Sequence, residues 1–306
     1  MQTAPLPLTH DIVLIGGGHT HALVLRKWGM NPLVGARLTL INPGPTAPYS
    51  GMLPGHVAGH YTRDALDIDL IRLARFANAR LILGAATHID PVARLVTVPG
   101  RPAIAYDICS VDIGITSDMP DIPGFADHAV PAKPLGPFAD AWATYQAGEG
   151  PARVAVIGGG VAGVELAMAM AHCLRQRGRQ ATVSLIDAGR VLNAIGATAQ
   201  SKLRRALAKA GVDLIENTAL KAVHADAVVL ENGTHLNADF VTGAAGARAH
   251  PWLATSGLTL ENGFIEVSDT LQSSDPAVFA VGDCAHLIHD PRPKAGVYAV
   301  RQAPIL

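Results

Sequence analysis

The stretch that decides the fold occurs twice, as "DIVLIGGGHTHALVL" over residues 11–25 and as "RVAVIGGGVAGVELA" over residues 153–167. Each copy begins with an apolar run of the kind that forms a buried parallel strand. Three glycines follow, and after them comes a run of small and apolar residues suited to a helix. The sequence therefore predicts two related units of strand, glycine turn and helix in one chain.

The second copy fits the pattern G-x-G-x-x-G without substitution, at Gly158, Gly160 and Gly163. The first glycine permits a tight turn, the second lets the backbone approach a pyrophosphate, and the third lets helix and strand pack closely. Phosphates then lie at a helix N-terminus, where N–H groups and the helix dipole favour anions. Asp187 ends the next predicted strand, where a carboxylate accepts both ribose hydroxyls and repels a 2′-phosphate. This favours NADH over NADPH, although Arg190 weakens the preference; the alternative is a tight turn that binds no nucleotide.

The first copy departs from the pattern. Gly16 and Gly18 are present, but His21 stands where the third glycine is expected, and Asn42 stands at the ribose position. An asparagine still hydrogen-bonds a ribose, without the charge. We interpret this turn as a modified dinucleotide site, with a decayed site as the alternative.

Strands alternate with helices along the chain, which is typical of α/β folds with parallel sheets. We expect strands at 11–16, 36–43, 106–115, 153–157 and 182–186, and helices at 19–30, 65–79, 137–147 and 161–177. The loop at 43–59 is long and rich in glycine and proline, which is typical of functional loops. Residues 116–138 have a similar composition and indicate a hinge.

Composition excludes several classes of protein. The chain has 306 residues, of which 49% are hydrophobic and 16% charged, with a net charge of −1. We therefore expect a globular protein that binds no nucleic acid. We detect no signal peptide and no membrane-spanning run, so we expect a cytoplasmic protein. The three cysteines, Cys109, Cys173 and Cys284, form no CxxC motif, and we expect packed thiols, with a redox role for Cys284 as the alternative.

A later stretch, "AVFAVGDCA" over residues 277–285, indicates to which family of proteins the chain is similar. Together with the glycine turns, "YDICSVDIG" (106–114) and "ADFVTGAAG" (238–246), it resembles the pyridine nucleotide–disulfide oxidoreductases, flavoproteins in which an NAD domain interrupts an FAD domain. The resemblance implies an α/β fold of two Rossmann-like dinucleotide-binding domains, with the family's C-terminal interface domain missing. The FAD-binding domain is expected at residues 1–125 and 246–306, and the NAD-binding domain at 126–245.

The resemblance also implies site residues for the cofactors FAD and NAD(H). Glu165 matches the acidic residue near the nicotinamide, and His21 is a candidate proton donor near the flavin; these are the two predicted catalytic residues. The predicted cofactor-binding residues are Gly16, Gly18, His19, Thr20, Asn42, Gly51, Met52, Ala86, Gly114, Gly282, Asp283, Gly158, Gly160, Val161, Gly163, Asp187 and Gly246.

Within the family, the chain is most similar to the branch of NADH:quinone dehydrogenases and sulfide:quinone reductases. The stretch "APYSGMLPGHVAGHY" (47–61) falls where that branch has a loop over the flavin, and "PKAGVYAVRQAP" (293–304) falls where it begins the helix under the flavin. The pair "GGGHTH" and "PYSGMLPGH" also resembles a subgroup fused ahead of selenide, water dikinase.

We therefore expect an FAD-dependent NADH oxidoreductase that passes a hydride from NADH to FAD and then reduces a small-molecule acceptor such as a quinone. Peripheral contact with the inner face of a membrane and a homodimer of a full-length form are further expectations. The alternatives are a low-turnover flavin-binding module linked to selenophosphate synthesis, and a reductase of sulfur or selenium compounds.

The histidine-rich stretches also suggest a metal site, at His19, His21, His56 and His60. The glycine-rich flanks make a helix that presents His56 and His60 on one face doubtful, and no acidic ligand is near. We therefore expect no metal, and we expect these histidines to line the flavin pocket.

Overall fold

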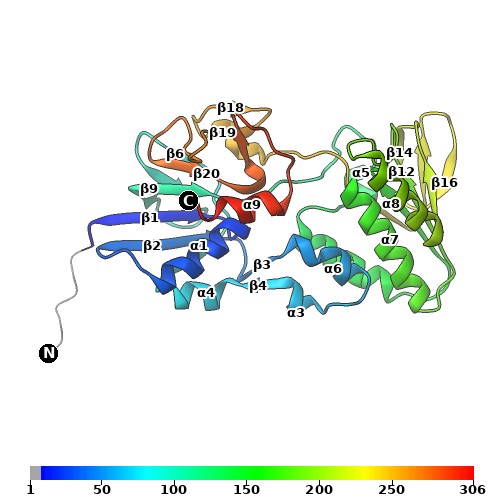
Figure 1. The fold of residues 1–306 in the computed structure, drawn as a ribbon, viewed down its shortest axis with the longest axis horizontal. Coiled ribbons are helices and arrows are strands. Elements are labelled where there is room, and N and C mark those ends of the chain that lie inside the picture. The colour runs from blue at the N-terminus through cyan, green and yellow to red at the C-terminus, as the bar shows by residue number, and fades with distance from the viewer. Residues whose placement is uncertain (1–7) are drawn as a thin grey trace. The chain divides into compact units, whose positions relative to one another are not determined.

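The computed structural model describes residues 8–306, which divide into two compact units (Figure 1). Unit 1 comprises the residues up to 49 together with 67–115 and 249–306, and unit 2 comprises 50–66 and 116–248. Each unit is built around a five-stranded parallel sheet. The two sheets confirm the predicted α/β class with two Rossmann-like folds.

The sheet of unit 1 places β1 at its centre. Its strands, in spatial order, are β20 (Val278–Ala280), β9 (Ile108–Val111), β1 (His10–Ile15), β2 (Ala36–Asn42) and β5 (Arg80–Leu83). Ile15 pairs with Ile41 on one side and with Val111 on the other. The first glycine turn therefore lies at the carboxyl ends of three strands at once.

Three helices accompany this sheet: α1 (His19–Met30), α4 (Leu70–Phe76) and α9 (Gly296–Gln302). The helix α9, red in Figure 1, lies beside α1. The Thr20 hydroxyl donates a hydrogen bond of 2.7 Å to the Ala299 carbonyl, and Thr20 is fully buried. The end of the chain is thereby fixed against the helix that follows the first glycine turn.

Unit 2 repeats the arrangement with β11 at the centre. Its strands, in spatial order, are β10 (Val130–Pro131), β17 (Phe240–Gly243), β11 (Ala152–Ile157), β12 (Ala181–Ile186) and β13 (Val212–Ile215). Ile157 pairs with Ile186 and with Gly243. The helices α7 (Val161–Gln176) and α8 (Ala197–Lys209) follow β11 and β12.

Smaller elements complete the two units. Those of unit 1 are β3 (Thr46–Pro48), β4 (Asp67–Asp69), β6 (His88–Asp90), β7 (Leu95–Thr97), β8 (Ile104–Ala105), η2 (Pro251–Thr255), β18 (Leu260–Glu261), β19 (Phe264–Val267), η3 (Gly282–Cys284) and β21 (Ala285–Leu287). Those of unit 2 are η1 (Ser50–Met52), α2 (Leu53–Val57), α3 (Arg63–Leu66), α5 (Phe125–His128), α6 (Leu135–Gln146), β14 (Leu220–Val223), β15 (Ala227–Leu230) and β16 (His235–Asn237).

The sequence analysis assigns residues 50–66 to the first domain, with a loop up to residue 59 and a helix from residue 65. This segment packs with unit 2 instead, because Leu53, Val57 and Leu66 share an apolar cluster with Trp142 of α6. The indole Nε1 of Trp142 donates to the Val57 carbonyl at 3.0 Å. The structural division of the chain otherwise falls at 115/116 and 248/249.

The helix expected at 65–79 is also interrupted. In its place the structure has the short helix α3, the strand β4 and the helix α4. The Asp69 carboxylate accepts the Arg72 N–H at 2.9 Å and caps the N-terminus of α4. An aspartate in this position begins a new helix rather than continuing one.

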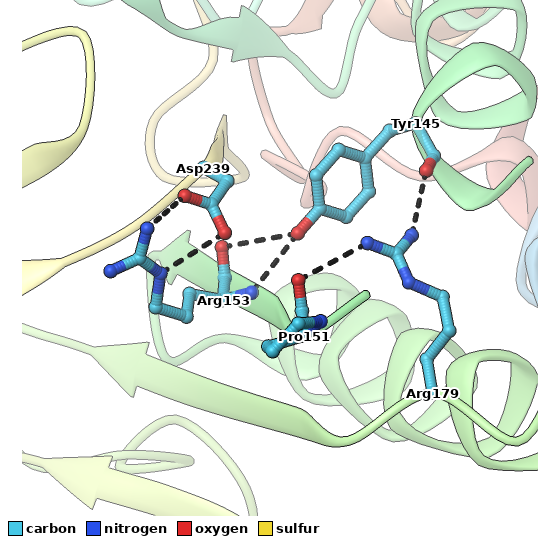
Figure 2. Close-up of polar contacts among 5 residues, drawn as sticks. All are labelled: Tyr145, Pro151, Arg153, Arg179 and Asp239. Atoms are coloured by element: carbon cyan, nitrogen blue, oxygen red, sulfur yellow. Dashed lines mark hydrogen bonds and ion pairs between the residues drawn. The ribbon is translucent and has the colours of Figure 1, made fainter. Parts of the chain in front are cut away.

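A polar cluster lies at the amino ends of β11 and β17 (Figure 2). The glycine turn follows the other end of β11. The Arg153 guanidinium forms two hydrogen bonds to the Asp239 carboxylate, at 2.5 and 3.1 Å. The Tyr145 hydroxyl accepts the Arg153 N–H at 3.0 Å, and Arg179 donates to the carbonyls of Tyr145 at 2.9 Å and Pro151 at 3.3 Å. These contacts join the C-terminus of α6 to the sheet.

We predict that Arg179→Ala lowers the free energy of unfolding by about 1–2 kcal/mol, because it removes hydrogen bonds to backbone carbonyls and the guanidinium stacked 5.1 Å from the Tyr145 ring centre. Urea denaturation measures the change. Arg177→Ala is the matched control, since Arg177 is exposed at the end of α7, and it should stay within about 0.5 kcal/mol of the parent. Equal effects of the two substitutions would contradict the assigned role.

Candidate functional site

The second glycine turn connects β11 to α7 in a geometry that only glycine accepts. Gly158 has φ +113°. A Cβ added at Gly163 would lie 1.9 Å from the Gly158 carbonyl oxygen, so the third glycine is required for helix and strand to approach. A Cβ added at Gly160 would meet no protein atom within 4 Å. The helix starts after Gly160 without a side-chain cap, which leaves backbone N–H groups available to an anion.

Asp187 lies directly after β12, at the strand end that the sequence analysis predicts. Its Oδ2 accepts the Gly159 N–H at 2.5 Å, and its Oδ1 accepts the Gly189 N–H at 2.7 Å. The carboxylate therefore holds the middle residue of the glycine turn and fixes the start of the following loop. It is only partly buried, so a ligand can reach it.

Val161 and Glu165 are both exposed on α7. Residues four apart lie on the same face of a helix, so Val161 in the first turn is followed by Glu165 in the second. Neighbouring atoms partly desolvate the Glu165 carboxyl, which raises its pKa. Gly246 follows β17 in the segment that returns to unit 1.

The first glycine turn repeats the hydrogen bond of the second. The Gly17 N–H donates to Asn42 Oδ1 at 2.8 Å, as Gly159 does to Asp187. The Asn42 amide then donates to the Gly44 carbonyl at 2.8 Å. Gly16 has φ +89°, and Asn42 is buried at the end of β2. The residue at the end of the second strand thus fixes the turn in each unit.

His21 replaces the third glycine, and its side chain is fully buried. Its Nδ1 lies 2.6 Å from the Gly16 carbonyl, which only accepts, so Nδ1 carries the proton. Its Nε2 then accepts from the Ser110 hydroxyl at 2.8 Å. Burial lowers the pKa of the ring to about 4, so it is neutral near pH 7.

This environment corrects the role that the sequence analysis gives to His21. Both ring nitrogens are engaged within the protein, and the side chain has no exposure to a ligand. The imidazole therefore fills the gap between α1 and the sheet that a third glycine would close. It acts as a structural residue and does not fit a proton donor to a flavin.

Asp112 is a component of this site that the sequence analysis missed. It follows β9, is fully buried, and its Oδ2 accepts the His21 N–H at 3.0 Å. A Cβ added at Gly18 would lie 2.2 Å from its Oδ1, and one added at Gly282 would lie 2.5 Å from the same atom. Burial raises its pKa to about 7. Aligning "YDICSVDIG" with "ADFVTGAAG" sets Asp112 against Ala244. An acid in one copy and an alanine in the other is the sequence feature that could have pointed to Asp112.

Other predicted residues of unit 1 also lie near this turn. The His19 ring contacts the Tyr49 ring edge-on at 4.8 Å. The Gly282 N–H donates to Gln302 Oε1 at 2.6 Å, and Asp283 follows in the short helix η3. Gly114 lies two residues beyond Asp112, where the chain leaves β9.

Three predicted cofactor residues lie elsewhere. Gly51 and Met52 belong to η1 of unit 2, where Met52 packs against the apolar cluster of that unit. Ala86 is buried in the apolar core of unit 1. A cofactor contact for each of them stays a prediction.

The cysteines are packed in the interior. All three are buried. The Cys284 thiol lies 3.2 Å from the Val281 carbonyl, and burial raises its pKa to about 12. Such a thiol is unreactive near neutral pH.

No group of three or more histidine, cysteine or acidic side chains suited to a metal ion occurs among residues 8–306. Within the same range, no helix has the length and apolar character needed to cross a membrane.

Two strand–turn–helix units, each with a side chain from the next strand holding its glycine turn, define a protein with paired dinucleotide-binding folds. Residues 10–303 match the family described as pyridine nucleotide-disulphide oxidoreductase, and the chain belongs to this family. Proteins of the family are flavin-dependent oxidoreductases that bind FAD and NAD(P)H.

The chain is 33% identical over 202 residues to the nitric oxide reductase FlRd-NAD(+) reductase of Aeromonas hydrophila, a match that covers 64% of this chain and 50% of that protein. It is 24% identical over 290 residues to the NADH dehydrogenase-like protein YutJ of Bacillus subtilis, covering 92% of this chain and 78% of that one. The matches to the FlRd-NAD(+) reductases of two Aeromonas species show that the chain spans about half the length of these curated relatives.

Solved structures share the fold. The covalent putidaredoxin reductase–putidaredoxin complex superimposes with a TM-score of 0.82 at 23% identity, over 97% of this chain and 74% of that one. The water-forming NADH oxidase of Lactobacillus brevis, bound to NADH, gives a TM-score of 0.83 at 21% identity, over 97% and 68%.

We predict opposite outcomes for two glycines of the second turn. Gly163→Ala places a Cβ on the Gly158 carbonyl and should lower the free energy of unfolding by about 2 kcal/mol or more. Gly160→Ala meets open space, so it should keep the parent stability but weaken NADH binding by about tenfold or more, since its methyl group enters the volume left for the ligand. Thermal unfolding and titration with NADH measure the two effects. Unchanged NADH affinity in Gly160→Ala would contradict the assignment of this turn.

Proposed function

We propose that the protein is an FAD-dependent NADH oxidoreductase, in which unit 1 binds FAD and unit 2 binds NADH. The observation that carries the proposal is the repeated hydrogen bond from the middle of each glycine turn to the end of the next strand, Gly17 to Asn42 and Gly159 to Asp187. A glycine turn that only reverses the chain direction would not need the same hydrogen bond in both sheets.

The residues of unit 2 fit NADH. The diphosphate would accept N–H groups at the start of α7, beside Gly160, where the protein leaves space. Asp187 would accept the ribose hydroxyls and repel a 2′-phosphate. Glu165 and Val161 share an exposed face of α7, and we assign this face to the nicotinamide end of the cofactor.

The residues of unit 1 fit FAD through the same features. The start of α1 at Gly18 would receive the diphosphate, and Asn42 would hydrogen-bond a ribose without a charge. Asp283 would bind the ribityl–phosphate region, and Ala86 and Gly114 are proposed further contacts within unit 1. When bound, FAD supplies the chemistry that accepts a hydride from NADH and releases the electrons to a second acceptor.

The acceptor is proposed to be a small molecule such as a quinone, or a small redox protein. The names of the FlRd-NAD(+) reductase and of the putidaredoxin complex give those proteins a redox-protein partner, which supports the second option. We also propose a cytoplasmic location with peripheral contact at the inner face of a membrane, and a homodimer of a full-length form.

The direct test is an absorption spectrum of the purified protein before and after NADH is added without oxygen. We predict a flavin band near roughly 450 nm that bleaches when NADH is added, because hydride transfer reduces the flavin. The Gly160→Ala variant is the control, and it should retain the band and bleach only at higher NADH concentrations. A band that NADH never bleaches would contradict the oxidoreductase proposal.

A second prediction concerns cofactor choice. Asp187→Asn keeps an oxygen that can accept the Gly159 N–H, as Asn42 does for Gly17, but removes the negative charge. NADPH binding should improve by about tenfold while NADH binding changes less, since the repulsion of the 2′-phosphate is lost. Asp213→Asn, at an exposed position on β13, is the charge-matched control. Unchanged NADPH affinity in Asp187→Asn would show that another residue sets the preference.

A second candidate function is a flavin-binding module with little turnover, linked to selenophosphate synthesis through the resemblance of its glycine and "PYSGMLPGH" stretches. The substitution at His21 and the carboxylate of Asp112 beside the first turn favour it. Reduction of sulfur or selenium compounds is less well supported, because it needs a reactive thiol and Cys284 is buried with a raised pKa.

A further inference from the structure

The buried carboxylate of Asp112 lies at the N-terminus of α1, where a dinucleotide diphosphate would bind. It accepts the His21 N–H at 3.0 Å, and the Thr20 N–H also stabilises its charged form. Its Oδ1 lies so close to Gly18 and Gly282 that a Cβ at either position would collide with it. The protein thus supplies a negative group of its own to N–H groups that otherwise favour an outside anion.

The equivalent place in unit 2 has no acid. In the parallel register, Ile15 pairs with Val111 and Ile157 pairs with Gly243, so the next residues, Asp112 and Ala244, are structural equivalents. Correspondingly, a Cβ at Gly160 would meet open space, whereas one at Gly18 would collide with the Asp112 carboxylate. The acid is therefore a feature of the first turn and not a requirement of the fold.

The ionisable groups around Asp112 lie on α1, on η3 and in the segment that precedes α9. Asp283, on η3, adds a second negative charge that disfavours ionisation of Asp112. The His21 ring, on α1, is neutral because burial lowers its pKa to about 4. The Cys284 thiol, on η3, is neutral because burial raises its pKa to about 12. Lys294 acts electrostatically on Cys284 and Asp283, and its Nζ donates to the Ala285 carbonyl at 2.5 Å.

We propose that Asp112 couples dinucleotide binding at the first glycine turn to uptake of a proton, so that the cofactor binds tightly only when this carboxyl is protonated. The proposal rests on the assignment of FAD to unit 1. A diphosphate beside the ionised carboxylate would face an uncompensated like charge in a buried setting, whereas the neutral acid has no such repulsion and donates a hydrogen bond.

The sign of the pH dependence follows from linkage. The bound diphosphate favours the neutral acid and raises the pKa of Asp112 above its value of about 7 in the free protein. The affinity for FAD is then highest at pH values below the pKa of Asp112 in the free protein, and it falls as the pH rises through that pKa. For one proton, the dissociation constant for FAD increases by up to about tenfold for each pH unit above that point, until the pKa of the complex is reached.

The experiment is titration of apoprotein with FAD, followed by flavin fluorescence, at pH values from about 6 to 8.5. The parent should bind about tenfold more weakly at pH 8 than at pH 6. Asp112→Asn, which has the same shape and no charge, should bind with nearly the same affinity at every pH. Asp107→Asn is the matched control at the other end of β9, where the carboxylate accepts the Asp11 N–H at 2.7 Å, and it should keep the parent's pH dependence.

Calorimetry in two buffers of different ionisation enthalpy supplies a second readout. At pH 8, binding of FAD to the parent should take up close to one proton, and binding to Asp112→Asn should take up about none. Circular dichroism over the same pH range separates loss of ligand from loss of fold.

The proposal would be overturned by a parent affinity that does not change with pH, or by an equal pH dependence in Asp112→Asn. Failure of parent, Asp112→Asn and Asp107→Asn to bind FAD at any pH would instead contradict the proposed function of unit 1, and the inference with it. The two failures are distinguishable, because the first requires measurable binding and the second excludes it.

Discussion

The structure depends on a close approach between each glycine turn and the end of the neighbouring strand. A Cβ at Gly16 would lie 2.2 Å from the Asp112 carbonyl oxygen, and one at Gly158 would lie 2.7 Å from the Ala245 nitrogen. Since no side chain fits there, both turns begin with glycine in the left-handed region. This approach allows α1 and α7 to direct their N-termini to the carboxyl edge of each sheet, where open α/β sheets bind ligands.

The two units have kept the same constraint while their chemistry has diverged. Asn42 and Asp187 make the same hydrogen bond to their turns, but only Asp187 carries a charge. In unit 1 the His21 imidazole lies between α1 and the sheet and hydrogen-bonds the Gly16 carbonyl. In unit 2 Gly163 has no side chain, and α7 packs directly against the glycine turn. Asp112 adds a buried acid where unit 2 has Ala244. The carboxylate thus lies at the strand end in unit 2 and beside the N-terminus of α1 in unit 1, which gives the two turns different electrostatic preferences for a similar ligand.

The sequence could predict those features that depend on short-range patterns. The strands around both turns and the position of Asp187 follow from apolar runs and glycine spacing over a few residues. The packing of segment 50–66 could not be predicted in this way, because it depends on Trp142 reaching Val57 across 85 residues. The burial of His21 depends on Ser110, which is similarly distant in sequence. Asp112 has an ordinary position after a strand, and its contact with α1 depends on β9 lying beside β1.

The central claim is that one chain holds two different dinucleotides, one at each turn. Native mass spectrometry of the protein incubated with FAD and NAD⁺ tests it most directly, because bound species are counted separately. The account predicts a complex that carries one FAD and one NAD⁺ at the same time. Mutually exclusive binding, or a chain that binds only one of the two, would contradict it.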